Sequence, residues 1–136
     1  MKKPLAPRKC YGFPKAFRLT APADFRLVFE RAVRSSDIWL TVLARPNGRG
    51  YARLGLALSR KQIRGAARRN RIKRVIRESF RLRRRHLGGF DYVVMARAAA
   101  ANADSGDLRR SLDHHWSTLL RRCANSSSAS SVSINS

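Results

Sequence analysis

The chain has 136 residues, with 30 lysines and arginines against 8 aspartates and glutamates, and its formal net charge is +22. This length fits one domain of about 100–150 residues, and a hydrophobic share of 43% is too high for a disordered polycation and too low for a membrane protein. The longest uncharged apolar stretch, 38–44, is far shorter than the ~20 residues of a membrane span, and no signal-peptide apolar run follows the charged start. We therefore expect a cytoplasmic protein with a polyanionic partner, either nucleic acid or an anionic membrane surface.

Cysteines and histidines are few and dispersed. Cys10 and Cys123 lie near opposite ends of the chain, whereas a disulfide scaffold needs denser cysteine and a zinc site needs clustered ligands. His86, His114 and His115 have no cysteine partner, and adjacent histidines on a helix cannot both face one metal ion. We therefore predict two free thiols in a reducing compartment, no protein-bound metal, and surface or interhelix roles for the histidines.

The two ends of the chain differ in composition from its middle. Residues 1–16 combine five lysines and arginines with three prolines, which predicts a flexible basic arm. Residues 123–136 are rich in serine and uncharged, which predicts a disordered tail. The folded domain is therefore expected over 17–122, a length that buries about 65% of the surface of the unfolded chain.

The first predicted element is a helix that begins near Thr20. Pro22 and Asp24 would lie in its first turn, where proline and an acidic side chain are favourable. Four apolar residues then follow the spacing of one helical face: Phe25, Val28, Phe29 and Ala32.

Two strands are predicted to follow this helix. The β-branched and aromatic run 38–43 is typical of a strand, and Asn47-Gly48 favours a type I′ turn after it. The alternation of Leu54, Leu56 and Leu58 predicts the second strand, which the turn would pair antiparallel with the first.

Two further elements complete the predicted fold. A third strand is expected over 91–97, after two glycines, and a last helix over about 104–120. With one helix inside the basic region 60–85, the order is α–β–β–α–β–α. This order predicts an α+β fold, an α/β sandwich in which helices cover a small mixed sheet.

The segment 60–85 holds 13 of the 30 basic residues and a single acid, Glu78. Its apolar positions form one helical stripe: Ile72, Val75, Ile76 and Phe80. Polar and basic side chains lie on the opposite side: Asn70, Arg74, Arg77 and Arg81. One helix is therefore predicted to present an apolar face to the sheet and an arginine face to an anion.

The alternative is that these arginines only solvate an exposed helix. Such helices usually mix charge signs, because like charges four residues apart repel by a few tenths of a kcal/mol. Here Arg77 and Arg81 form such a like-charge pair, as do Arg81 and Arg85. A counter-ion in the working state is the better explanation, and the planar arginine fork favours phosphates and exposed bases over lipid headgroups.

The run 67–80, Ala-Arg-Arg-Asn-Arg-Ile-Lys-Arg-Val-Ile-Arg-Glu-Ser-Phe, resembles the "RNR" segment of the protein component of bacterial ribonuclease P. Further similarity lies in shorter segments: 53–61, Asp91–Val94 after Gly88-Gly89, Leu19-Thr20, Phe25–Phe29 and Trp116. The resemblance covers about residues 17–120, nearly all of the predicted domain.

In that family a large RNA subunit with Mg²⁺ cleaves the 5′ leader from precursor tRNA, and the small basic protein binds both that RNA and the single-stranded leader. The resemblance therefore implies a subunit of ribonuclease P with no catalytic residue of its own. It implies Mg²⁺ held mainly by RNA and substrate, no obligate protein partner and no membrane contact. It also implies a left-handed crossover between parallel strands, carrying the basic helix, against the general right-handed rule.

The RNA-contacting set implied by the resemblance comprises ten residues: Arg60, Lys61, Arg68, Arg69, Asn70, Arg71, Lys73, Arg74, Arg77 and Arg81. Helical geometry agrees for Asn70, Arg74 and Arg77. In contrast, Arg69 and Arg71 would have to act from the first turn of the helix or the loop before it.

The resemblance further implies a channel for the leader along the sheet and the first helix, with Phe25, Phe29 and Thr41 as candidates. Core packing is the alternative for both phenylalanines, and more so for Phe29. Some family members have a tyrosine where Thr41 falls. Trp39 could stack from the other face of the strand, although a strand tryptophan more often packs in the core.

Other functions also fit parts of the sequence. A general basic RNA-binding or chromosomal protein would explain the charge, but not an ordered match over 100 residues. A membrane-active helix would not belong to a domain with a sheet, and a self-sufficient metal nuclease would need clustered acids.

Overall fold

The computed structural model describes residues 17–19 and 21–132, with side chains to Cys123, and the expected basic arm 1–16 lies outside them. The elements in chain order are α2 (Pro22–Glu30), β1 (Val33–Ser36), β2 (Leu40–Pro46), β3 (Arg53–Ala57), α3 (Ala66–Leu87), β4 (Phe90–Ala96), the 3₁₀ helix η2 (Ala98–Asn102) and α4 (Ser105–Val132). The predicted α+β class is confirmed, and β1 is an additional strand that the sequence pattern did not indicate.

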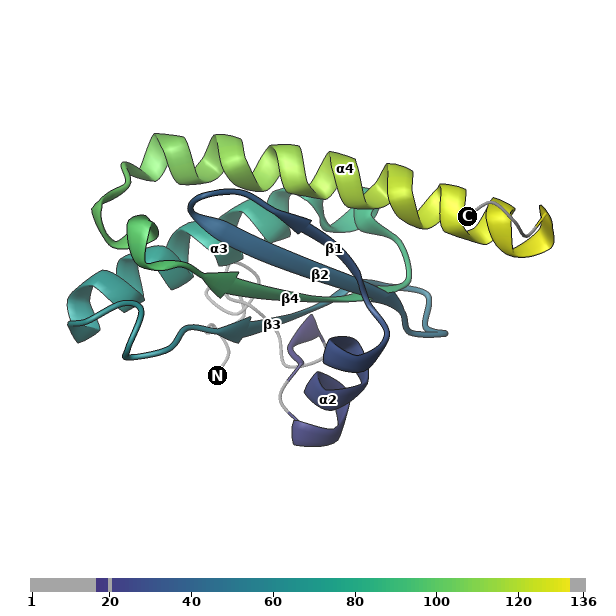
Figure 1. Cartoon of the computed structure of the whole chain (residues 1–136), viewed down its shortest axis with the longest axis horizontal. Helices are drawn as coiled ribbons and strands as arrows, with labels where there is room; N and C mark the ends of the chain where they lie inside the picture. Colours follow the sequence, from purple (N-terminus) through teal and green to yellow (C-terminus); the bar gives the residue numbers. More distant parts are fainter. Residues whose placement is uncertain (1–16, 20, 133–136) are drawn as a thin grey trace, which may run out of the picture.

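The sheet has the strand order β1-β2-β4-β3 (Figure 1). β2 pairs antiparallel with both β1 and β4, and β3 pairs parallel with β4. Because β3 and β4 are parallel neighbours joined through α3, the basic helix forms the expected crossover, whose left hand stays a prediction.

The predicted hairpin at Asn47-Gly48 is wrong. β4 lies between β2 and β3, so the connection after Pro46 crosses the end of β4 instead of making a two-residue turn. The Asn47 N–H donates to the Gly89 carbonyl at 3.0 Å. Gly89 has no space for a side chain there, because a Cβ would lie 2.2 Å from the Arg49 carbonyl oxygen. Gly48 does adopt a positive φ of 70°, so the turn at this glycine is confirmed. The predicted pairing of the two strands that it joins is wrong.

β1 was missed because only one of its four residues, Ser35, is buried. Its pairing with β2 depends on Asp37 in the intervening turn. One oxygen of this carboxylate accepts the N–H groups of Trp39 and Leu40, both at 2.8 Å. The Asp37 side chain therefore organises this hairpin, which explains why the apolar pattern of the strand did not reveal it.

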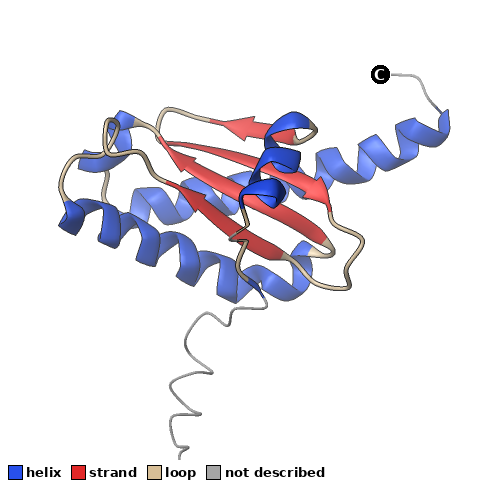
Figure 2. Cartoon of the chain, turned by 90° about the horizontal axis from the view of Figure 1, so that it is seen from below, coloured by secondary structure: helices blue, strands red, loops and turns tan. Residues whose placement is uncertain are grey.

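Helices cover the two faces of the sheet unequally. α3 and α4 pack on one face, and α2 lies on the other (Figures 1 and 2). The main core lies between the sheet and the two longer helices and includes Phe80, Tyr92 and Trp116. A smaller cluster lies under α2: Leu19, Val28, Leu43 and Val93.

α4 is longer than expected. It runs past the predicted end at Leu120 to Val132, and so enters the segment 123–136 that was expected to be disordered. Its C-terminal part projects past the sheet (Figure 1). Extending an established helix costs far less than starting one, because nucleation has already been achieved.

Candidate nucleic-acid interface

The loop before α3 is ordered by one serine and one buried isoleucine. Ser59 Oγ accepts the N–H groups of Lys61 and Gln62, at 3.0 and 3.3 Å. Ile63 is fully buried and anchors the loop to the core. Arg60 and Lys61 are consequently held exposed just ahead of α3.

Gly65 sets the entry into α3. Its φ of 91° lies in the left-handed region, where a side chain would be strained. The helix then begins with two alanines, the best helix formers.

The predicted phase of α3 is confirmed. Ile72, Ile76 and Phe80 are completely buried, and Val75 nearly so. Phe80 packs edge-on against Tyr92 and Trp116, and the Trp116 indole donates to Ser79 Oγ at 2.9 Å. This packing of the buried side of α3 fixes the rotation of the helix about its axis. It leaves four side chains exposed along the other side, here called the arginine stripe: Asn70, Arg74, Arg77 and Arg81.

The stripe is positively charged without internal compensation. The only acid of α3, Glu78, pairs instead with Arg109 of α4 at 3.2 Å, and Arg83 pairs with Asp113 of α4 at 3.2 Å. In the part of the chain that the structure describes, no acidic side chain pairs with a stripe arginine. Burial, and then the neighbouring Arg18 guanidinium, lower the pKa of Arg77. A bound anion would offset this repulsion.

Four other residues of the implied set lie outside the stripe. Arg69 donates to the Ile63 carbonyl at 3.0 Å, so it holds the loop to the helix. Arg71 reaches toward η2 and α4, with Ser105 Oγ and the Ala101 carbonyl both at 3.4 Å. Lys73 is half-buried at the border of the stripe, whereas Arg68 is exposed in the first turn. The structure therefore gathers Asn70, Arg74, Arg77 and Arg81 but not the complete set.

The opposite face of the sheet carries the leader-channel candidates. Phe25 is half-buried over Gly55 of β3, where a Cβ would lie 2.7 Å from the Phe25 ring. Phe29 stacks against Phe25, with ring centroids 6.5 Å apart, and is 49% exposed. The core alternative for Phe29 is therefore wrong. It lies on the outer side of α2, because Val28 is the residue that faces the sheet.

An open groove lies at one end of this sheet face. Its volume is about 460 Å³, and Thr41, Ala57 and Met95 contribute to its lining. Ala57 and Met95 also pack against the cluster under α2, as Phe25 does, so the groove and Phe25 border the same cluster. Thr41 itself is 7% exposed, and its hydroxyl bonds Ser36 Oγ at 2.6 Å. Trp39 packs against the main core on the other face.

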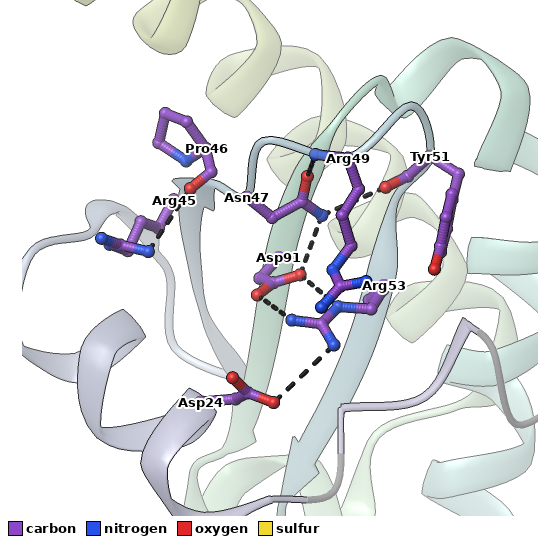
Figure 3. Close-up of polar contacts among 8 residues, drawn as sticks. All are labelled: Asp24, Arg45, Pro46, Asn47, Arg49, Tyr51, Arg53 and Asp91. Atoms are coloured by element: carbon purple, nitrogen blue, oxygen red, sulfur yellow. Dashed lines mark hydrogen bonds and ion pairs between the residues drawn. The ribbon is translucent and has the colours of Figure 1, made fainter.

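A nearly buried ion pair positions α2 over the sheet (Figure 3). Arg53 of β3 donates to both oxygens of Asp91 of β4, at 2.8 and 2.7 Å, and its remaining nitrogen lies 3.7 Å from Asp24 of α2. Asn47 also donates to Asp91, at 2.9 Å. The hydrogen bonding of the Arg53 guanidinium to the Asp91 carboxylate is the main cause that raises the pKa of Arg53. Asp24 therefore joins α2 to the sheet, besides lying in the first turn.

Sequence reasoning missed a second buried polar cluster. His115 is completely buried, with Nδ1 2.6 Å from Ser35 Oγ and Nε2 3.2 Å from Asp37. Ser111 also donates to Asp37. Serine, histidine and aspartate recur together in hydrolases, but here Ser35 is only 4% exposed and no substrate can approach it. The cluster joins the β1–β2 hairpin to α4, so the surface or interhelix role expected for the histidines is wrong for His115.

The described residues offer no metal site, because no three acidic, histidine or cysteine side chains gather closely enough to hold an ion. Over the same residues, no helix is both long and apolar enough to cross a membrane. Fold and surface together define a small basic α+β domain of the RNA-binding class.

Comparison with known proteins specifies this class further. The Ribonuclease P family model matches residues 13–120. The ribonuclease P protein component of Methylococcus capsulatus is 61% identical over 128 residues, which cover 94% of this chain and 99% of that protein. The component of Thioalkalivibrio sulfidiphilus is 46% identical, over 84% of this chain and 95% of that protein.

Solved structures agree. The RNase P protein of Staphylococcus aureus matches with a TM-score of 0.70 and 30% identity, over 80% of this chain and 96% of that one. The RNase P protein from Thermotoga maritima matches with a TM-score of 0.65 and 34% identity, over 76% of this chain and 96% of that one. The chain belongs to the Ribonuclease P family, and its role is that of the protein subunit.

Proposed function

We propose that this subunit binds the catalytic RNA of ribonuclease P with the exposed side of α3, binds the single-stranded 5′ leader of precursor tRNA along the sheet face beside α2, and thereby promotes Mg²⁺-dependent removal of the leader in the cytoplasm. The observation that carries this proposal is the arginine stripe. It places three arginines and an asparagine on one exposed side of a rigid helix, with no acid of the described residues paired to them.

The chemistry of the stripe favours RNA as the ligand. Arginine presents a planar fork that matches phosphate with two parallel hydrogen bonds, and its plane also stacks on unpaired bases. Asn70 adds an amide that can both donate and accept hydrogen bonds. Because the packing of the buried side of α3 fixes the rotation of the helix, these side chains can contact RNA without a reordering of the backbone.

The leader requires a different kind of surface, since an unpaired strand offers base faces as well as phosphates. The exposed ring of Phe29 and the groove at Thr41 and Met95, on the same face of the sheet, supply such a surface. The loop residues Ser59 and Gln62 also line this groove, so it borders the loop that carries Arg60 and Lys61. The groove and the start of α3 are therefore adjacent, as simultaneous binding of leader and RNA subunit requires.

The protein is proposed to act by binding and positioning, while the RNA subunit carries the bond cleavage. Asp91, the most buried carboxylate, is engaged by Arg53 and Asn47, and the described residues form no three-ligand metal cluster. The side chains of the described residues therefore do not form a site that suits Mg²⁺, and we assign the ion to the RNA subunit and the substrate.

The stripe can be tested by titrating a bacterial ribonuclease P RNA with Arg74→Gln and Arg77→Gln. Each variant is expected to weaken binding and to reduce the slope of log K against log salt by about 1, because one phosphate contact is lost. Arg121→Gln on α4 is the matched control, since it removes the same charge from an exposed site outside the stripe. Equal losses in all three variants would mean that net charge alone drives binding, which contradicts the proposal.

The leader surface needs its own test. Phe29→Ala is expected to weaken binding of a precursor tRNA with a long leader by the holoenzyme roughly fivefold or more, the loss typical of one base-stacking contact. Binding of mature tRNA should not change. Leu27→Ala is the control, because Leu27 is an exposed apolar residue of the same helix. A loss that is independent of leader length would contradict the assignment.

A further inference from the structure

A second, smaller pocket lies at the far end of α3. Its volume is about 290 Å³, close to the lower limit of ordinary ligand pockets, so it suits one base-sized group. Six residues line it: Phe17, Gly50, Tyr51, Arg84, Arg85 and Gly88. They come from the segment before α2, the β2–β3 connection and the C-terminal end of α3.

The pocket already contains a stacked pair. The Arg84 guanidinium lies over the ring of Phe17, 4.0 Å from its centroid. Tyr51 contacts Phe17 edge-on, with centroids 5.4 Å apart and ring planes at 81°. Phe17, Tyr51 and Arg84 are each half-buried. A guanidinium fixed in this way on an aromatic ring still offers its second face, and bases of unpaired RNA stack on such planes.

The pocket continues the arginine stripe. At about 100° per residue, Arg81, Arg84 and Arg85 fall on the same side of α3 as Asn70. The rise of 1.5 Å per residue places Arg85 about 22 Å from Asn70 along the helix axis. Arg85 is exposed beside the pocket, where it can reach a phosphate.

We propose that this pocket binds one unpaired nucleotide of the RNA subunit, with its base stacked on the Arg84 guanidinium and its phosphate held by Arg85. The inference rests on the proposed function, because it extends the RNA contact of α3 from the Arg-Asn-Arg segment to the other end of the helix. Phe17 and Tyr51 act as positioning residues, since they hold the guanidinium plane in place.

The position of the pocket favours the RNA subunit over the leader. The groove assigned to the leader includes Ala96 at the end of β4, whereas Gly88 of this pocket lies two residues before the start of that strand. Six steps of about 3.3 Å separate the two ends of β4, which places the sites roughly 20 Å apart. The pocket instead shares its helix with the proposed RNA-subunit interface.

Arg84→Lys tests the stacking directly, because lysine keeps the charge but loses the planar group. We expect affinity for the RNA subunit alone to fall roughly fivefold or more, with an unchanged salt slope. Chemical probing of unpaired bases in the holoenzyme with a bound precursor tRNA should show one base of the RNA subunit that the wild-type protein protects and Arg84→Lys leaves reactive. Phe17→Leu should give the same loss of protection, and Arg121→Gln should keep it. A thermal melt of each variant checks that the domain is folded.

Each outcome bears on the proposal. If Arg84→Lys binds like wild type while Arg84→Gln is weakened, the site holds only a phosphate, and the base-stacking proposal is wrong. If the protected base lies in the leader of a precursor tRNA, the assigned source is wrong. In both cases Arg74→Gln still weakens RNA binding, so the proposed function stands. If wild-type protein fails to bind the RNA subunit at all, the proposed function and this inference both fail.

Discussion

Arg53 and Asp91 form a two-point ion pair between neighbouring parallel strands, with side chains only 11% and 6% exposed. The same guanidinium faces Asp24 of α2, so one residue connects the sheet to the helix that carries Phe25 and Phe29. The geometry of the candidate leader surface therefore depends on a pair that makes no contact with RNA in our proposal.

Arg53→Met is expected to destabilise the fold by about 3–5 kcal/mol, because it leaves the Asp91 carboxylate buried without its cation. Urea unfolding followed by circular dichroism measures this loss. Arg45→Met is the control, since Arg45 lies in β2 and its one contact within the described part of the chain is a long one to the Pro46 carbonyl. It should change stability by less than about 0.5 kcal/mol. Equal stabilities of the two variants would contradict the structural role of the pair.

Ile76→Ala is expected to cost about 2–5 kcal/mol in the free energy of unfolding, because Ile76 is completely buried under α3 and the substitution leaves a cavity. Leu82→Ala on the same helix should be nearly neutral, since Leu82 is 67% exposed. Chemical denaturation of both proteins gives the comparison. If Ile76→Ala were as stable as Leu82→Ala, the phase of α3, and with it the arginine stripe, would be wrong.

Gly55→Ala is expected to displace the ring of Phe25, because the added Cβ would lie 2.7 Å from that ring and 3.1 Å from the Leu19 Cβ. Overpacking of this kind costs about 1–3 kcal/mol. Gly50→Ala is a matched control, as no atom lies within 4 Å of its added Cβ. Thermal melts should separate the two variants, and a neutral Gly55→Ala would show that Phe25 does not pack closely on β3.

Stability is expected to fall as the pH decreases from 7 to 5, because of His115. Burial lowers its pKa below the usual 6.5, with Asp37 opposing and His114 and Arg122 adding to the effect. The folded protein therefore binds this proton less tightly than the unfolded chain, and stability is lost as the pH drops below about 6.5.

Asp37 contributes in a different pH range. Burial raises the pKa of Asp37, but the hydrogen bonds from Ser111, Leu40 and Trp39 outweigh this and lower it. Its stabilisation is therefore lost only as the pH falls below about 4. Urea unfolding midpoints measured between pH 7 and pH 5 therefore report on His115 without a contribution from Asp37. His115→Asn should flatten this dependence and His114→Gln should keep it, whereas equal slopes in both variants would contradict the assignment.

The sequence predicted those parts of the fold that depend on regular apolar spacing. The apolar side of α3, from Ile72 to Phe80, predicted both the position and the rotation of this helix, because a helix that buries one side must expose the other. The Arg-Asn-Arg segment and its surroundings gave the family, which the comparisons confirm.

Features that depend on contacts between distant residues were not predictable in this way. The Asn47-Gly48 turn indicated a reversal of the chain, but nothing local showed that β4 would enter between β2 and β3. The β1 strand depends on Asp37 and on the burial of Ser35 against His115, 80 residues later in the chain. Arg69 and Arg71 belong to the basic segment by sequence, yet their side chains are engaged with the protein itself.

The most direct test of the account is cleavage of a 5′-extended precursor tRNA by a bacterial ribonuclease P RNA at low Mg²⁺. RNA alone, protein alone, and the two combined form the three arms. We predict efficient removal of the leader only when RNA and protein are combined, and a reduced rate at subsaturating protein when Arg74→Gln replaces the wild type. Cleavage by the protein alone, or no stimulation of an intact RNA subunit by the folded protein, would contradict the central claim.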